Sequence, residues 1–259
     1  MTIPEQLNST VKKIDFWGYV VNQSYLILKT DILTLTNGTE DIMKKLCIFD
    51  FDGTMFDSIS DVARCFNETF DELGYERLDL EYYRKSLGGN VDEIIGIILK
   101  DNNNAENVEL VKKTYEKIYN NDLKENTHLF AGIHELLENL QDDGFVLAIN
   151  SNRKTASIRK FIDRFAGDID FVDIQGHEYS HPSKPDAYGV NAILEKSGIS
   201  REDTVYIGDS ATDVATSRNA GIDCIIVTWG YGMEDVYADE YPIAVVDNPF
   251  DILKIVKKE

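Results

Sequence analysis

The sequence predicts an α/β protein: a Rossmann-like, doubly wound parallel sheet with an inserted, small, all-helical cap domain. Three observations lead to this prediction. Short continuous apolar segments alternate with segments of helical periodicity, polar residues follow the apolar segments, and residues 58–128 interrupt the alternation. Continuous apolar segments are typical of strands that are covered on both faces, as in parallel sheets.

Segments dense in β-branched or aromatic residues are the predicted strands, and they cover 46–50, 145–150, 171–174, 204–208, 224–228 and 243–246. Apolar residues spaced by three and four predict helices at 130–142, 154–166, 185–197 and 249–258. This repeated strand–helix–strand order gives a doubly wound sheet, because each crossover helix packs on one of its faces.

The interval 58–128 contains only helical patterns, and the predicted helices cover 58–73, 79–86, 91–100 and 107–121. An insert of this length exceeds what a crossover connection needs, so it should form a small domain of its own. We therefore expect a catalytic core made of residues 43–57 and 129–259, with residues 58–128 as a helical cap.

Residues 1–42 stand apart from this pattern and supply no candidate catalytic motif. Two β-prone segments, 17–21 and 25–28, could pair as a hairpin. Two explanations remain open: an added packing or dimerisation element, or sequence upstream of a natural start at Met43. We favour the second, because Met43 leads directly into the first predicted strand. The oligomeric state stays open.

The amino-acid composition restricts the classes of partner that the chain can bind. The chain of 259 residues has 26 Lys and Arg against 46 Asp and Glu, a formal net charge of −20. Such a surface repels polyanions, so we expect neither a nucleic-acid partner nor membrane binding. Cys47, Cys65 and Cys224 show no paired spacing, which indicates reduced thiols and a cytoplasmic location. A small phosphorylated metabolite could still bind beside local cations or a metal.

Polar residues occur where predicted strands end. Asp50 closes the first strand, Ser151 follows the strand at 145–150, and Asp209 follows the strand at 204–208. In open parallel sheets, ligands bind beyond the carboxyl ends of the strands, where the strand order reverses. Two carboxylates and a hydroxyl group should therefore meet at one site.

The segment from Asp50 to Thr54, Asp-Phe-Asp-Gly-Thr, is the most informative. On an extended backbone, Asp50 and Asp52 point the same way, and Gly53 allows a tight turn that brings backbone N–H groups close to a ligand. Two neighbouring carboxylates need a proton or a cation between them. This suits a nucleophile beside a general acid/base, although an acidic turn without function has the same composition.

Four motifs in order resemble those of the haloacid dehalogenase-like superfamily: the segment 50–54, Ser151 after an apolar strand, Lys184-Pro185, and the segment 208–213. The helical insert after the first motif is similar to the cap of the phosphoglycolate phosphatase and β-phosphoglucomutase branch. Phe-Asp-Ser at 56–58 and Thr-Trp-Gly-Tyr-Gly at 228–232 look like the phosphoglycolate phosphatase side.

The resemblance implies a role for each matched residue. Asp50 would be the nucleophile and Asp52 the general acid/base, while Ser151 and Asn152 would bind the phosphoryl group. Lys184 would place its ammonium between Asp50 and that group. Ser151 could instead be a helix N-cap, and Lys184 a solvated surface lysine. Gly53 and Thr54 are further predicted substrate-binding residues.

The resemblance also implies Mg²⁺ as cofactor. Its protein ligands would be Asp50, the backbone carbonyl of Asp52, Asp209 and Asp213. Hard oxygen ligands beside phosphate chemistry suit this ion. Asp213 could instead bind Lys184 or a metal-bound water.

In the cap, Arg84, Gly88 and Gly89 are candidates for contact with the non-phosphate part of the substrate. The alternative is an ordinary helix C-terminus, where cations and glycine are both common. The four histidines show no ligand spacing and should be structural or surface residues.

The resulting hypothesis is a Mg²⁺-dependent phosphatase that acts on a small metabolite through an aspartyl-phosphate, with phosphoglycolate as the leading substrate by resemblance. An inorganic pyrophosphatase or a sugar-phosphate mutase of the same branch is the alternative enzyme. A non-catalytic binding or regulatory protein with this fold is the alternative of another class, but it would not need Asp52.

Overall fold

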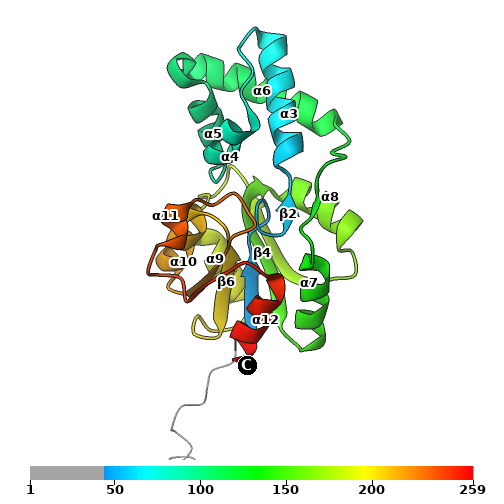
Figure 1. The fold of residues 1–259 in the computed structure, drawn as a ribbon, viewed down its shortest axis with the longest axis vertical. Coiled ribbons are helices and arrows are strands. Elements are labelled where there is room, and N and C mark those ends of the chain that lie inside the picture. Colours follow the sequence, from blue (N-terminus) through cyan, green and yellow to red (C-terminus); the bar gives the residue numbers. More distant parts are fainter. Residues whose placement is uncertain (1–43, 259) are drawn as a thin grey trace, which may run out of the picture. The chain divides into compact units, whose positions relative to one another are not determined.

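The computed structural model describes residues 44–258, so the predictions made for residues 1–42 lie outside the described residues. Within 44–258, six parallel strands form one sheet in the order β5-β4-β1-β6-β7-β8 (Figure 1). These strands are β1 (Leu46–Phe49), β4 (Val146–Lys154), β5 (Phe171–His177), β6 (Thr204–Gly208), β7 (Asp223–Val227) and β8 (Ala244–Val246). The strand order reverses between β1 and β6, which confirms the predicted doubly wound sheet.

The central strand β1 buries side chains on both faces. Cys47 and Phe49 point into a cluster with α7 (Ile133–Asp142), α8 (Thr155–Phe165) and α12 (Pro249–Lys257). Leu46 and Ile48 point the other way, toward α9 (Tyr188–Ser197). Because successive strand residues face opposite sides, a strand covered on both faces must be apolar throughout, as this one is.

The helices on the sheet follow the predicted apolar spacing. In α7, the four residues at intervals of three and four, Ile133, Leu136, Leu137 and Leu140, are all buried. Two helices of the described residues were not predicted: the four-residue α11 (Glu234–Tyr237) and α10 (Ala211–Ala220). The helix α10 has little helical apolar periodicity, because Val214 is its only large apolar residue. It begins with a capping box between Ser210 and Asp213, and it covers β6 and β7.

The cap consists of α3 (Ile59–Leu73), α4 (Leu80–Ser86), α5 (Val91–Ile98), a short 3₁₀ turn (Lys100–Asn102) and α6 (Ala105–Asn121). These helices enclose a hydrophobic cluster separate from the sheet clusters, in which the Phe66 and Tyr115 rings stack with centroids 3.8 Å apart. The cap therefore has a core of its own.

Two short strands carry the chain into and out of the cap, and Figure 1 labels the first of them, β2. They are β2 (Phe56–Asp57) and β3 (His128–Leu129), which pair antiparallel. The sequence did not predict them, since a pair of two-residue strands shows no periodicity. Among residues 44–258, no helix is long and apolar enough to cross a membrane.

Candidate active site

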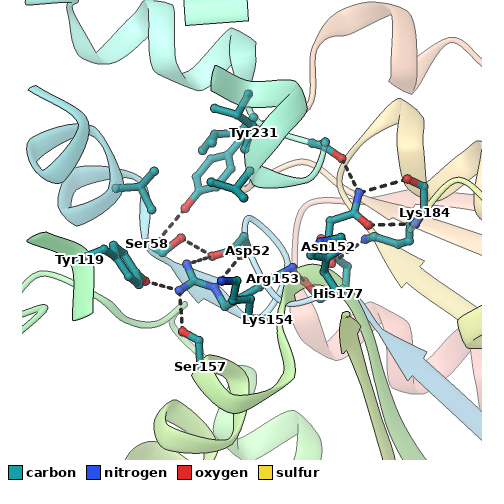
Figure 2. A pocket seen from close by; sticks show the side chains of 18 of the residues that line it. Asp52, Ser58, Tyr119, Asn152, Arg153, Lys154, Ser157, His177, Lys184 and Tyr231 are labelled. Carbon is teal, nitrogen blue, oxygen red and sulfur yellow. Dashed lines mark hydrogen bonds and ion pairs between the residues drawn. The ribbon is translucent and has the colours of Figure 1, made fainter. Parts of the chain in front are cut away.

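A cavity of about 200 Å³ lies between the residues that follow the sheet strands and the helices of the cap (Figure 2). Its lining includes eight of the predicted site residues: Asp50, Asp52, Gly88, Gly89, Ser151, Asn152, Lys184 and Asp209. Four other predicted residues lie outside the lining: Gly53, Thr54, Arg84 and Asp213. The ends of β1, β4 and β6 thus bring together side chains that are far apart in the sequence.

Lys184 is buried between two carboxylates. Its ammonium donates to Asp50 Oδ1 and to Asp213 Oδ1, each at 2.7 Å. The alternative that Lys184 is a solvated surface residue is wrong, because it is 6% exposed. An ammonium in this position fixes the Asp50 carboxylate at the end of β1 and partly neutralises it.

Burial dominates the electrostatics of this group. It raises the pKa of Asp50 to about 7, although the Lys184 ammonium opposes the rise. Burial, followed by the charges of Asp213 and Asp50, raises the pKa of Asp209 well above its usual range. For Lys184, burial alone would lower the pKa, but Asp213 and Asp50 raise it well above its usual value. Three carboxylates are thus buried near one ammonium, which pairs with Asp50 and Asp213, and a further cation beside them would stabilise their ionised forms.

Asp209 is held from three sides. Its Oδ2 accepts from the Tyr231 backbone N–H at 2.6 Å, and its Oδ1 accepts from Thr54 Oγ1 at 3.2 Å. Gly53 packs directly against it: a Cβ atom at position 53 would lie 2.3 Å from Asp209 Oδ2. Gly53 also has a φ of +85°, which favours glycine. Gly53 and Thr54 thus position Asp209 from outside the cavity.

Asp213, unlike Asp50, has protein donors on both of its oxygens, and one of those donors is the Lys184 ammonium. Oδ1 accepts from Lys184, while Oδ2 accepts from Ser210 Oγ at 2.6 Å and from the Ser210 N–H at 3.0 Å. These contacts favour the alternative in which Asp213 holds Lys184. Oxygens of Asp50, Asp209 and Asp213 nevertheless lie within 4.8 Å of one another, and a set of carboxylates fits Mg²⁺.

Ser151 and Asn152 lie in the last part of β4, beyond its predicted end. Ser151 is buried and accepts the Arg153 N–H at 3.2 Å. The alternative that it is a helix N-cap is wrong, because α8 begins at Thr155 with Lys154 at the N-cap. Asn152 fixes the backbone of Lys184: it accepts from the Lys184 N–H at 2.9 Å and donates to the Lys184 carbonyl at 3.2 Å.

Asp52 has a partner that the sequence did not indicate (Figure 2). Arg153 donates from Nε to Asp52 Oδ2 at 2.8 Å and from Nη2 to Oδ1 at 2.6 Å, while Ser58 Oγ also donates to Oδ1. The only sequence signal was that Arg153 follows the Ser151-Asn152 motif. Nothing in the sequence distinguishes it from a surface arginine.

Arg84 contacts the core rather than the cavity. Its guanidinium donates to the Gly230 carbonyl at 3.4 Å and lies over the Tyr231 ring, 5.5 Å from the centroid. Gly88 has a second contact with the core, because its carbonyl accepts from Asn152 Nδ2 at 3.2 Å. These contacts link the cap to the loops that hold the site.

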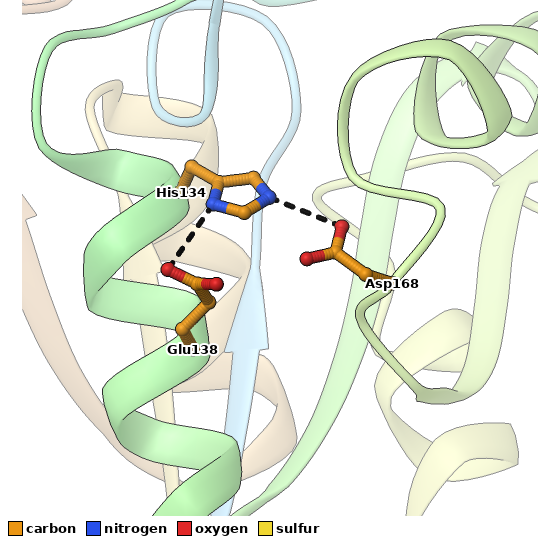
Figure 3. A group of neighbouring side chains, drawn as sticks. All are labelled: His134, Glu138 and Asp168. Carbon is orange, nitrogen blue, oxygen red and sulfur yellow. Dashed lines mark hydrogen bonds and ion pairs between the residues drawn. The ribbon is translucent and has the colours of Figure 1, made fainter.

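A second group of potential metal ligands, His134, Glu138 and Asp168, lies apart from the cavity (Figure 3). His134 Nδ1 is 3.4 Å from Glu138, and its Nε2 is 3.1 Å from Asp168. The hydrogen bond to Asp168 raises the pKa of His134. His134 is partly exposed, Glu138 and Asp168 are exposed, and both carboxylates contact the His134 ring. We therefore assign the three side chains a structural role between α7 and the loop before β5.

A buried carboxylate–ammonium group at the carboxyl ends of a doubly wound sheet, facing a cavity lined by an inserted helical cap, defines an α/β enzyme. The sequence model of the haloacid dehalogenase-like hydrolases matches residues 47–227, and the chain belongs to this family. The resemblance seen in the four motifs is thus confirmed.

Individual relatives agree with this assignment. The chain is 27% identical to phosphoglycolate phosphatase from Aliivibrio fischeri over 214 residues, which cover 80% of this chain and 93% of that protein. Identity to the Vibrio parahaemolyticus protein of the same name is 26% over 218 residues, with coverages of 82% and 96%. A solved structure from Lactobacillus delbrueckii has a TM-score of 0.78 at 23% identity, covering 84% of this chain and 100% of that chain. A haloacid dehalogenase-like family hydrolase from Streptococcus pneumoniae has a TM-score of 0.74 at 23% identity, with coverages of 82% and 98%. The two structures share the fold of this chain.

Proposed function

We propose that the chain hydrolyses a small phosphate monoester in a Mg²⁺-dependent reaction that passes through an aspartyl-phosphate on Asp50. One observation carries the proposal: Asp50 is buried, lies 2.7 Å from the Lys184 ammonium, and shares a cavity with Asp52. A fixed ammonium reduces the repulsion between a carboxylate nucleophile and the phosphate dianion that it must attack.

The proposed reaction has two steps. First, an oxygen of the Asp50 carboxylate attacks phosphorus, and the bond from phosphorus to the leaving oxygen breaks. Protonated Asp52 gives its proton to that oxygen, which yields a neutral alcohol and an Asp52 carboxylate. Second, the Asp52 carboxylate takes a proton from water while the water oxygen attacks phosphorus. The bond from Asp50 to phosphorus then breaks, which releases inorganic phosphate and restores both carboxyl groups.

The remaining site residues bind and orient the phosphoryl group in this proposal. Ser151 and Asn152 would bind its oxygens, while Lys184 keeps Asp50 in place. Asp50, Asp209 and the backbone carbonyl of Asp52 would hold Mg²⁺, with Asp213 as a further ligand or only as the partner of Lys184. When bound, the ion compensates the negative charge of the carboxylates and the phosphoryl oxygens.

The cavity volume of about 200 Å³ is of a size that suits a small substrate. Phosphoglycolate is the first substrate to test, because the relatives with 26% and 27% identity are named for it. A panel of phosphate monoesters with pyrophosphate, assayed with and without Mg²⁺, separates a monoester phosphatase from a pyrophosphatase. Product analysis on sugar phosphates separates it from a mutase, which would return the phosphoryl group to the sugar.

Asp50→Asn is the direct test of covalent catalysis. We expect it to retain less than about a hundredth of wild-type turnover, because a neutral amide is a poor nucleophile toward phosphorus. Asp52→Asn should keep the fold and Mg²⁺ binding and lose mainly the acid/base contribution, about 10²- to 10⁴-fold in turnover. The matched control is Asp142→Asn, on the exposed side of α7. Full activity in Asp50→Asn would disprove the mechanism.

A further inference from the structure

Arg153 is the most extensively bonded side chain that lines the cavity. It is the residue directly after Asn152 in β4, and its side chain is only 8% exposed. Its Nε and Nη2 form a forked pair with the two oxygens of Asp52, at 2.8 and 2.6 Å. Because the guanidinium is planar and rigid, a forked pair of this kind fixes the orientation of the carboxylate as well as its position.

The third nitrogen of Arg153 reaches the cap. Nη1 donates to the Tyr119 hydroxyl, at the end of α6, and to Ser157 Oγ at 3.2 Å (Figure 2). All three guanidinium nitrogens therefore have partners. Asp52 and Ser157 belong to the core, whereas Tyr119 belongs to the cap, so a single side chain connects the two.

Aromatic rings from three elements surround the guanidinium. Its central carbon lies 5.3 Å from the centroid of Phe51, 5.6 Å from that of Tyr119 and 5.4 Å from that of Phe161. Such contacts favour a cation and restrict its movement. A buried arginine is costly unless every contact is well formed, so this arrangement holds Arg153 in one place.

The pairing leaves Asp52 able to react. A carboxylate has about four acceptor positions on its two oxygens. Arg153 uses two of them and the Ser58 hydroxyl uses a third, so one position remains. Because Asp52 also lines the cavity, the remaining position can carry the proton that Asp52 gives to the leaving oxygen or takes from water.

We propose that Arg153 is the positioning residue of the acid/base Asp52, and that Tyr119 makes this position depend on the cap. The inference rests on the proposed phosphatase function. When the cap covers the core, the Tyr119 hydroxyl and ring complete the surroundings of Arg153, and the forked pair orients Asp52. When the cap moves away, Arg153 loses these contacts and Asp52 is held less firmly. Proton transfer is thereby confined to the covered site.

The test uses two substrates that differ in their need for an acid. The nitrophenolate of p-nitrophenyl phosphate leaves without a proton, whereas the alkoxide of glycerol phosphate needs one. The variants are Arg153→Met, which removes the donors, Arg153→Lys, which keeps the charge without the fork, and Tyr119→Phe, which removes only the hydroxyl. Arg159→Met, at an exposed position of α8, is the matched control.

For Arg153→Met and Arg153→Lys we expect kcat on glycerol phosphate to fall about ten- to hundredfold, with little change in KM. Release of nitrophenolate in the first turnover should be as fast as in wild type, because that step needs no acid, while later turnover slows. Tyr119→Phe should show the same pattern with a smaller loss. Thermal unfolding identifies any variant that fails to fold, and Tyr119→Phe then carries the test.

Equal loss on both substrates, including the initial release of nitrophenolate, would overturn the inference, because it would make Arg153 merely structural. Activities equal to those of Arg159→Met would also overturn it. In both cases the proposed function would stand if Asp50→Asn is inactive. If wild-type protein shows no Mg²⁺-dependent hydrolysis of any monoester, the proposed function and this inference fail together.

Discussion

Gly53 shows at the scale of one residue how backbone conformation and the active site depend on each other. Gly53→Ala should lose most Mg²⁺-dependent activity, because the added Cβ would collide with Asp209, at 2.3 Å from its Oδ2. Because alanine is strained at a positive φ, the substitution should also lower the free energy of unfolding by about 1–3 kcal/mol. Turnover and thermal unfolding measure the two effects separately.

Gly74→Ala is the matched control. Gly74 ends α3 with a φ of +77°, but an added Cβ would meet nothing within 4 Å. It should therefore lose a similar amount of stability while keeping its activity. If both variants were equally active, the close contact between Gly53 and Asp209 would be irrelevant to the site.

The sequence predicted those cavity residues whose position follows from the strands, and it missed residues that reach the cavity through contacts distant in the chain. Asp50 and Asp209 were found because each follows an apolar segment that could be recognised as a strand. Lys184 follows no strand directly and was identified only through the resemblance. Arg153 could not be identified, because its partner Asp52 is 101 residues away and the cap contact with Tyr119 depends on tertiary structure.

At the scale of elements, the Asp61 side chain links the first and last segments of the cap insert by hydrogen bonds. It lies in the first turn of α3, is fully buried, and accepts from the Asn126 N–H at 3.0 Å and from Thr127 Oγ1 at 2.8 Å. Both partners directly precede β3. Burial alone would raise the pKa of Asp61, but hydrogen bonds from Asn126, Arg64 and Thr127 outweigh it and lower the pKa below 3.8.

Asp61→Asn should lower the free energy of unfolding at pH 7 by about 1–3 kcal/mol, because buried donors lose an ionised acceptor. The pKa of Asp61 is lower in the folded protein, so its contribution is fully present above the unfolded value of 3.8. It is lost as the pH falls through the folded pKa. Denaturant unfolding of both proteins should thus show a constant difference near neutral pH that shrinks in acid. A difference that persists unchanged in strong acid would contradict this explanation.

The elements themselves were predictable to different degrees. The sheet strands and the helix at 133–142 follow directly from dense apolar segments and helical spacing. The helix at 211–220 was missed, since its start depends on capping by Ser210 rather than on an apolar face. The short strands β2 and β3 exist through their pairing with each other, which no local pattern records.

At the scale of the whole described unit, the site joins two separate hydrophobic cores. Asp50, Lys184 and Asp209 belong to the sheet domain, whereas the cap, with its own core, provides Gly88 and Tyr119. A small insert connected by two short strands suits a cover that opens to admit substrate and closes to exclude water. The acidic surface, with a net charge of −20, makes local cations necessary for any phosphate to approach.

The central claim is that Asp50 becomes phosphorylated during turnover, and one measurement tests it most directly. The protein is mixed with Mg²⁺ and p-nitrophenyl phosphate, whose leaving group needs no proton from Asp52, then quenched in acid within one turnover and digested for mass spectrometry. We predict a phosphoryl group on the peptide that contains Asp50, present in wild type, more abundant in Asp52→Asn, and absent from Asp50→Asn. Rapid turnover by the wild-type protein, with no phosphoryl group on Asp50 in wild type or in Asp52→Asn, would contradict the claim.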